Sequence, residues 1–270
     1  MKVFSFDRGG VYLQMVKMSA KIQFTYRSNV WFQFLSVLVQ IYLLQVIWTD
    51  VYQHQGQSNP IQLHALIAYL TLTNLQTWVL QPQITDVLQR RISTGEVALD
   101  IVKPVNFLVQ LLLQQFGFTL GLLPLVLCVL PFAFLVGAMQ LPVSVAALGY
   151  YLLSFLFSYA IATFIGILIG LAAMWILEIT GILLIYRFIN QLFAGALVPL
   201  WFFPSALRAL AAFLPFQAIA FLPASIYLGT ISQSEVWRVL GIQACWLCLL
   251  YGLTHLVWHK VRRRVMLQGG

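Results

Sequence analysis

Charged side chains are scarce in this sequence. Only 8% of its 270 residues are Asp, Glu, Lys or Arg, while hydrophobic residues make up 61%. A typical soluble chain has about 25% charged residues. With a mean hydropathy of +0.89, the chain has too few polar side chains to cover a globule in water. The composition therefore excludes a soluble domain and predicts an all-α polytopic membrane protein, with residues 1–270 forming one transmembrane domain.

Groups that carry out catalysis or hold metals are also missing. The cysteines Cys128, Cys245 and Cys248 lie in apolar runs, so they predict buried small residues rather than disulfides or a metal site. The sequence lacks the nucleotide-binding motif G-x-x-x-x-G-K-[ST], and it lacks H-E-x-x-H and G-x-S-x-G. We therefore expect no catalytic residue, no metal ligand and no cofactor bound by this chain.

Two weaker arrangements of catalytic residue types are present. His255 and His259 are four residues apart, but no carboxylates lie near them in the sequence, so packing at the membrane interface is the favoured interpretation. Ser154 or Ser158 could form a nucleophile–base pair with His255, yet no spacing connects them. Neither arrangement predicts an enzyme.

Six stretches are apolar enough to cross a bilayer, which needs about 20 mostly apolar residues. Their predicted bounds are 29–51, 61–79, 105–136, 143–177, 181–203 and 236–258. The second could continue toward Leu88. The third is long enough to be tilted, or broken near Pro124 and Pro131.

The basic residues are distributed unevenly between the two ends of these stretches. Five precede the first stretch, three lie between the second and third, and four follow the sixth, together twelve of the fifteen Lys and Arg residues. Cytoplasmic loops carry such an excess, so both termini are predicted to be cytoplasmic, which requires an even number of spans. The net charge of +8 is thus interpreted as a topology signal, and no nucleic-acid partner is expected.

Residues 11–26 differ from the spans. Apolar side chains recur at spacings of four, three and four residues, on one face of a helix: Val11, Met15, Met18 and Ile22. Lys17 and Lys21 lie on another face. This pattern is typical of an amphipathic helix in the membrane interface, in contact with lipid. The alternative is a frayed extension of the first span.

The segment 84–104 is a charged cytoplasmic connection. Its charged residues outside the first turn are Arg90, Arg91, Glu96, Asp100 and Lys103. Ser93 and Glu96 have the spacing of a capping box, which predicts a short helix over 94–102, and Pro104 disfavours its continuation. An ordinary connector is the alternative.

The segment 197–230 is too apolar for a solvated loop. Prolines divide it into pieces that are too short to span a membrane. Broken helices at membrane depth are tolerated only against protein or a water-filled cavity. We therefore predict short re-entrant or interfacial helices on the non-cytoplasmic side, immediately before the last span.

Polar residues inside the spans are mostly amides rather than charges. Ion-driven carriers usually keep buried charges, so this pattern argues against such a carrier. Four amides could line a path for an amphipathic cargo or cross-link helices: Gln40, Asn74, Gln114 and Asn190. Glu178 and Arg187 are interpreted as interfacial or paired charges. The small-residue pairs Gly117-x-x-x-Gly121 and Gly166-x-x-x-Gly170 are typical of helix packing.

Two motifs resemble those of a known family. The run Arg91-Ile-Ser-Thr-Gly-Glu-Val-Ala-Leu-Asp-Ile-Val-Lys-Pro-Val-Asn106 is similar to R-x-x-x-G-E-L-x-x-x-L-x-[KR]-P-[VI]-[NS]. Gly195-Ala-Leu-Val-Pro-Leu-Trp-Phe-Phe-Pro204, followed by Leu214-Pro-Phe216, is similar to G-x-x-[IV]-P-L-x-x-[FL]-P…L-P-[FW]. Both occur in permease subunits of bacterial type-2 ATP-binding cassette (ABC) exporters, in the daunorubicin-export-like group. The resemblance covers nearly the whole chain.

The resemblance implies a function for each segment. A separate subunit would hydrolyse ATP with Mg²⁺, and a second copy or a homologous permease would complete the unit in the bacterial inner membrane. The segment around 94–103 would couple to the ATPase through Arg90, Arg91, Glu96, Asp100 and Lys103, and the N-terminal helix would touch it. The broken segment would form the outer gate with Pro199, Pro204, Pro215 and Phe216. The cargo would be amphipathic or hydrophobic. A non-transporting membrane scaffold is the alternative, and an ion-coupled carrier ranks third.

Overall fold

The computed structural model describes residues 8–25, 27–55, 62–97, 100, 106–176 and 179–268. Within these ranges the chain forms helices and turns, without a strand, as the all-α prediction requires. The first elements are α1 (Arg8–Thr25), α2 (Arg27–Gln55), α3 (Leu63–Val79), α4 (Ile84–Ser93), α6 (Phe107–Leu135) and α7 (Val145–Ala172). The later ones are α8 (Thr180–Phe193), η1 (Leu200–Phe202), α9 (Ser205–Ala212), η2 (Pro215–Ala218), α10 (Phe221–Tyr227) and α11 (Gln233–Gln268).

Four helices in the described part of the chain are long and apolar enough to cross a membrane. They are Val30–His54, Phe107–Leu135, Val145–Ala172 and Gln233–Arg263. This confirms four of the predicted spans. The other two correspond to α3, with 17 residues, and α8, with 14 residues. At 1.5 Å per residue these reach about 25 and 21 Å, short of the ~30 Å hydrocarbon core. Six spans therefore stays a prediction.

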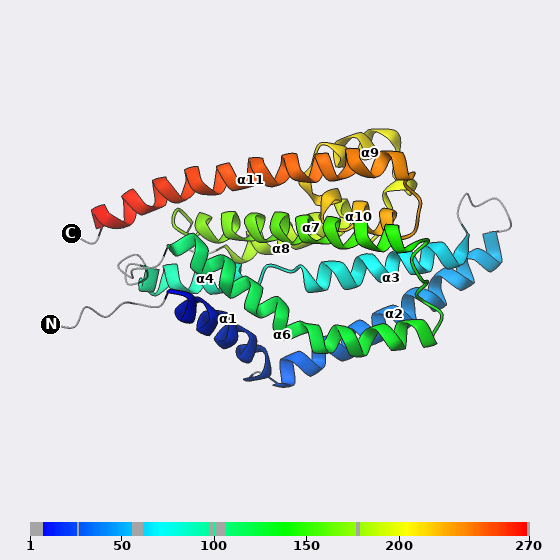
Figure 1. Cartoon of the computed structure of the whole chain (residues 1–270), viewed down its shortest axis with the longest axis horizontal. Helices are drawn as coiled ribbons and strands as arrows, with labels where there is room; N and C mark the ends of the chain where they lie inside the picture. Colours follow the sequence, from blue (N-terminus) through cyan, green and yellow to red (C-terminus); the bar gives the residue numbers. More distant parts are fainter. Residues whose placement is uncertain are drawn as a thin grey trace.

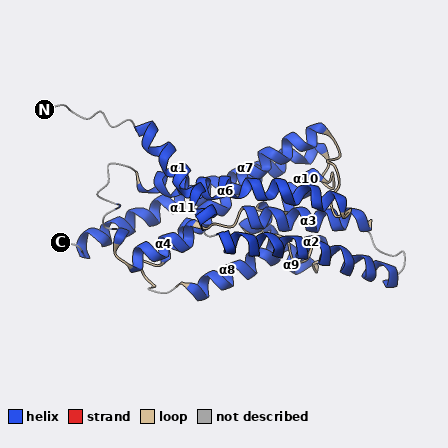
Figure 2. Cartoon of the chain, turned by 90° about the horizontal axis from the view of Figure 1, so that it is seen from below, coloured by secondary structure: helices blue, strands red, loops and turns tan. Residues whose placement is uncertain are grey.

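The long helices run side by side along the long axis of the molecule (Figure 1). The helices α1 and α4 and the last turns of α11 lie at one end, and α9 and α10 lie near the other. A view turned by 90° keeps this arrangement (Figure 2). α6 remains one helix across Pro124 and Pro131, but it changes direction along its length (Figure 1), as helices that contain proline do.

The small-residue pairs pack helices of the same chain together. A Cβ atom at Gly117 would lie 2.5 Å from the carbonyl oxygen of Val16, so the absence of a side chain lets α1 lie directly on α6. A Cβ atom at Gly170 would lie 2.9 Å from Leu88 Cδ2, and one at Gly166 would collide with Pro82. Thus α1 packs against the glycine of α6, and α4 packs against the glycines of α7.

α1 is a separate helix packed on α6, with Ser19 buried opposite Gly117. The predicted apolar face is not the packed face, because Met18 is 68% and Ile22 46% exposed. Ser19 instead occupies the contact, since a small side chain fits where two backbones approach closely. The interfacial position of α1, with Lys17 and Lys21 exposed, stays a prediction.

Candidate functional site

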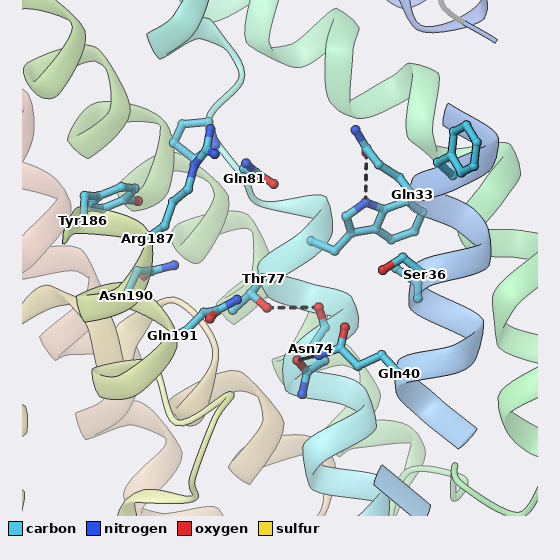
Figure 3. Close-up of a pocket in the computed structure, with 14 residues that line it drawn as sticks. Gln33, Ser36, Gln40, Asn74, Thr77, Gln81, Tyr186, Arg187, Asn190 and Gln191 are labelled. Atoms are coloured by element: carbon cyan, nitrogen blue, oxygen red, sulfur yellow. Dashed lines mark hydrogen bonds between the residues drawn. The ribbon is translucent and has the colours of Figure 1, made fainter. Parts of the chain in front are cut away.

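Three of the four amides predicted to line a path lie around one cavity. It has a volume of about 460 Å³ and lies between α2, α3 and α8 (Figure 3). α2 contributes Gln40, α3 contributes Asn74 and α8 contributes Asn190. The remaining lining residues include Gln33, Ser36, Thr77, Gln81, Tyr186, Arg187 and Gln191. Side chains from three helices that are distant in sequence therefore make a wall of both polar and apolar groups.

Hydrogen bonds show that two of these amides also hold the helices together. Gln40 Nε2 donates to Asn74 Oδ1 at 2.6 Å, which joins α2 to α3. Asn74 Nδ2 donates to the carbonyl oxygens of Leu70, at 2.8 Å, and of Ala196, at 3.0 Å. Gln40 and Asn74 therefore pack the helices together and also border the cavity, while their place along a transport path stays a prediction.

Other polar atoms of this wall have no hydrogen-bond partner among the described residues. They are the hydroxyl of Tyr186 and Oδ1 of Asn190, both buried on α8. Buried polar atoms normally have a hydrogen-bond partner, so we expect these two atoms to bond to water or to a polar group of a ligand. Neither Tyr186 nor Gln81 was singled out from the sequence, because nothing in the local pattern shows that they face a cavity.

A second cavity of about 900 Å³ continues from the first toward the end that carries α4. Gln114, the fourth predicted amide, lines it from α6, and Met15 lines it from α1. Gln33, Gln81 and Arg187 line both cavities. The two hollows therefore adjoin one another.

The charged residues predicted for coupling border this second cavity. Arg90, Arg91 and Glu96 all line it, and Arg90 and Glu96 are exposed. Asp100 differs, because it is only 4% exposed and its Oδ2 lies 3.0 Å from Arg91 Nη1. The prediction that Asp100 is available to a partner is therefore wrong: its carboxylate is engaged within the chain. Lys103 lies outside the described residues.

The predicted capping box is also wrong at Ser93. This residue ends α4, and its hydroxyl donates to the carbonyl oxygens of Gln89 and Arg90, both at 3.0 Å. Gly95 follows with φ of +76°, a conformation that terminates helices and that glycine adopts without strain. The pattern Ser-Thr-Gly thus marks a helix end rather than a helix start. Of the predicted helix over 94–102, only Glu96, Val97 and Asp100 are described as helical.

The sequence predicted that the residues of α4 belong to a connector, unless the second span, 61–79, continues toward Leu88. Its buried residues Ile84, Thr85 and Leu88 lie on one face. The backbone N–H of Ile84 donates to Gln115 Oε1 on α6, at 3.0 Å, and Thr85 Oγ1 donates to the carbonyl oxygen of Gly166 on α7, also at 3.0 Å. α4 is thus attached to two of the membrane-crossing helices.

Arg187 is a paired charge, as predicted. Its Nη2 lies 3.5 Å from Asp86 Oδ2, and both side chains are about half exposed. The pair connects α8 to the first turn of α4, where the two cavities adjoin. An exposed pair contributes only ~0–1 kcal/mol to stability. Its role here is to hold α8 and α4 in position relative to each other. Glu178 lies outside the described residues.

The segment before the last span is broken into short helices, as its prolines predict. Pro204 directly precedes α9, and Pro215 begins η2. The two parts of this segment, Ser205–Ala212 and Pro215–Tyr227, are bent by 72° relative to each other. Phe216 packs against Tyr186 with ring centroids 6.2 Å apart, so the broken segment reaches the wall of the first cavity. Pro199 is buried beside η1.

α8 ends ten residues before the predicted end of the fifth span. Gly195, with φ of +75°, ends it, and the N–H of Ala196 donates to the carbonyl oxygen of Gln191 at 3.1 Å. The hydroxyl of the fully buried Tyr69 donates to the carbonyl oxygen of Gly195 at 3.0 Å. The Trp201 ring packs against Tyr69 at a tilt of 57°, with centroids 4.4 Å apart. α3 therefore holds the turn that leads into the broken segment.

A buried polar network holds the other side of this segment. Gln243 on α11 donates through Nε2 to the carbonyl oxygen of Ala218 in η2, at 2.9 Å, and accepts from Ser154 Oγ at 2.8 Å. Ser158 Oγ donates to the same Ala218 oxygen at 2.7 Å. The two serines are thus bonded to Gln243 and the backbone, while His255 packs on Tyr251.

Sequence comparison places the chain among known proteins. The family described as ABC-2 family transporter protein matches residues 34–269, which is most of the chain. A comparison with curated proteins finds no match. A match over this length, together with several apolar membrane-crossing helices, establishes the family. The chain belongs to the ABC-2 transporter family, whose members are membrane-embedded permeases of ABC transporters.

Proposed function

We propose that this chain is the permease subunit of an ATP-driven exporter, and that it forms the path for an amphipathic or hydrophobic cargo. A partner subunit would hydrolyse ATP with Mg²⁺, since the chain has no nucleotide-binding motif. The observation that carries the proposal is that two cavities adjoin beside α4 and share Gln33, Gln81 and Arg187. The daunorubicin-export-like group remains the expected subgroup.

The contacts of α4 support a coupling role. A subunit that pushes on α4 would act on α7 through Thr85 and Gly166 and on α6 through Gln115. It would act on α8 through the pair of Asp86 with Arg187. The connections to α7 and α6 are 3.0 Å bonds that involve helix backbone, so a displacement of α4 would be transmitted to these helices, while the pair with Arg187 adds a weaker link. The exposed residues Arg90 and Glu96 are the groups that we assign to docking.

A route to the opposite end follows from α7. Ser158, two helical turns from Gly166 along α7, donates to Ala218 in η2. A shift of α7 would therefore move the broken segment, which we assign to the outer gate. The orientation proposed from the basic residues puts α4 and both termini in the cytoplasm of a bacterial cell and the broken segment outside.

A second permease, identical or homologous, would complete the path along α2. Only 17% of the most apolar window of α2 is buried, compared with 28% for α6 and α11 and 50% for α7. Large apolar side chains lie exposed along it: Trp31, Phe32, Leu35, Val39, Tyr42, Leu43, Val46 and Ile47. Gln33, Ser36 and Gln40 of the same helix line the first cavity. A second copy against α2 would thus enclose the path.

The test is association with the ATPase subunit from the native membrane. Tagged chain is purified as wild type and as the double variant Arg90→Glu, Glu96→Lys, which reverses both exposed docking charges without touching the pair of Arg91 with Asp100. We expect wild type to recover an ATPase and the variant to lose it. Glu235→Lys, on the exposed first turn of α11, is the control and should recover it fully. A wild-type chain that never recovers an ATPase would favour a membrane scaffold instead.

A further inference from the structure

The larger cavity has a composition that the coupling role does not explain. Residues of α1, α4 and α6 line it. The helices α1 and α4 lie at one end of the molecule (Figures 1 and 2). The cavity volume of about 900 Å³ is in the range of small-molecule sites, which is about 300–1,000 Å³. Its wall combines arginines, amides and an apolar strip, a combination that packing alone does not require.

The first part of the wall is cationic. Arg90 is exposed to the cavity, and no carboxylate within the described part of the chain pairs with it. Among the described residues, Arg187 pairs with the half-exposed Asp86. A guanidinium group binds phosphate through two parallel N–H groups. The guanidinium group of Arg90 has no carboxylate partner among the described residues, so it can bind a phosphate group.

The second part of the wall consists of unpaired acceptors. Gln110 is 3% and Gln114 9% exposed, and Oε1 of each has no hydrogen-bond partner among the described residues. These residues lie one turn apart on α6 and both line the cavity. Because Oε1 of each is buried, each amide must rotate to reach a group bound there. An acceptor is satisfied only by a donor such as a hydroxyl or ammonium group. Glu96 adds a carboxylate to the wall of the same cavity.

The third part of the wall is apolar and comes from α1. Met15, Met18 and Ile22 line the cavity, together with Phe118 of α6. Met18 and Ile22 are largely exposed. Three of the four residues of the apolar face predicted for α1 thus border the cavity, and this face can cover an acyl chain.

We propose that this cavity binds a phospholipid whose head group carries phosphate together with hydrogen-bond donors, such as glycerol hydroxyls or a primary ammonium. Arg90 binds the phosphate, Gln110 and Gln114 accept from the donors, and α1 covers the acyl chain. Because the cavity adjoins the first cavity at Gln33, Gln81 and Arg187, the site is the entrance of the proposed path. Only this last assignment rests on the proposed function.

The experiment measures lipid binding to the purified full-length chain by native mass spectrometry. The probes are dioctanoyl phosphatidylglycerol and phosphatidylethanolamine, which have phosphate and donors, and phosphatidylcholine, whose quaternary ammonium cannot donate. Glycerol 3-phosphate tests whether free phosphate binds without an acyl chain. We expect the first two lipids to bind about tenfold more tightly than phosphatidylcholine, as one good hydrogen bond provides. Glycerol 3-phosphate should bind far more weakly.

Two variants assign the preference to the cavity. Arg90→Gln should weaken phosphatidylglycerol binding about tenfold. Gln110→Leu with Gln114→Leu should remove the preference over phosphatidylcholine, since the acceptors are gone. Arg238→Gln, an exposed arginine on α11 near the opposite end, is the matched control and should change nothing. Circular dichroism and the unfolding temperature confirm that each variant folds.

Each outcome decides the proposal. Equal binding of all three lipids, or unchanged binding in both variants, would overturn the head-group site. Glycerol 3-phosphate that binds as tightly as the lipids would overturn the role of α1. Lipid selectivity without recovery of an ATPase would leave the site standing and refute the exporter, so the two proposals fail separately.

Discussion

The hydroxyl of Thr85 donates a 3.0 Å hydrogen bond to the carbonyl oxygen of Gly166, which joins α4 to the backbone of α7. This contact exists because residue 166 has no side chain: a Cβ atom there would collide with Pro82 and lie 2.9 Å from Thr85 Oγ1. α7 then continues to Ser158 and, through it, to Ala218 in the broken segment. One rigid helix thus connects the proposed docking helix to the proposed gate.

Gly166→Ala should separate α4 from α7. Overpacking of a close contact costs about 1–3 kcal/mol, so we expect a lower unfolding temperature and less cargo exported per ATP hydrolysed. Gly149→Ala on the same helix is the control, because nothing lies within 4 Å of its added methyl group. It should be neutral or slightly stabilising, since alanine favours helix. Equal behaviour of the two variants would show that the contact of α4 with α7 is unimportant.

Gly195→Ala should disturb the turn into the broken segment. The residue has φ of +75°, which costs a non-glycine residue about 1–2 kcal/mol, and the new methyl group would meet the Tyr69 hydroxyl. We expect a leaky gate, measured as passive uptake of small polar dyes into proteoliposomes.

Gly181→Ala is the control for the gate, because it lies at the start of α8 with open space around it and no positive φ. Tyr69→Phe, which removes only the hydrogen bond to Gly195, should give a smaller leak. If proteoliposomes that contain the Gly195→Ala variant take up no more dye than those with wild type, the gate assignment is refuted.

Gln243→Leu should weaken the attachment of η2 to α7 and α11. Loss of its bonds leaves the Ser154 hydroxyl without its acceptor and the Ala218 carbonyl with fewer donors, at a cost of about 1–3 kcal/mol. Thermal unfolding in detergent measures it. The same substitution at the exposed Gln233, at the start of the same helix, should have little effect. Similar unfolding temperatures for both variants would mean that the network contributes no net stability.

The proposed orientation predicts which ends are reached from each side of the membrane. In a variant with Cys128, Cys245 and Cys248 replaced, Ser232→Cys should react with an impermeant maleimide in intact cells. Ser93→Cys should react only after permeabilisation, because it lies at the end of α4. Both serines are exposed, so accessibility depends on the side rather than on burial. The reverse pattern would invert the assignment of docking helix and gate.

The long apolar runs made the four confirmed spans predictable, because a run such as that of α7 has no other stable location than a bilayer. Short helices were harder to predict from the sequence. α4 holds Arg90 and Arg91 and follows Pro82, so its local pattern resembles a connector, and only Gly166 and Gln115 reveal that it is docked.

The cavities could be predicted only in part. Residue type identified Gln40, Asn74 and Asn190, because an amide in an apolar run needs a partner. Their convergence on one cavity depends on how α2, α3 and α8 pack, which no local pattern encodes. The early end of α8 was missed for a related reason. Gly195 is surrounded by apolar residues, and only its φ of +75° and the bond from Tyr69 reveal the turn.

The central claim is that the chain forms an export path driven by a partner ATPase through α4. The most direct measurement is ATP-dependent accumulation of a fluorescent short-chain phosphatidylglycerol, the lipid class that we propose for the entrance, in inverted membrane vesicles that contain the chain and its co-purified ATPase. We predict accumulation that requires Mg²⁺ and ATP and that falls to background with Glu96→Lys, which keeps the proposed phosphate-binding Arg90, but not with Glu235→Lys. Accumulation that persists with Glu96→Lys, or that is driven by an ion gradient without ATP, would contradict the account.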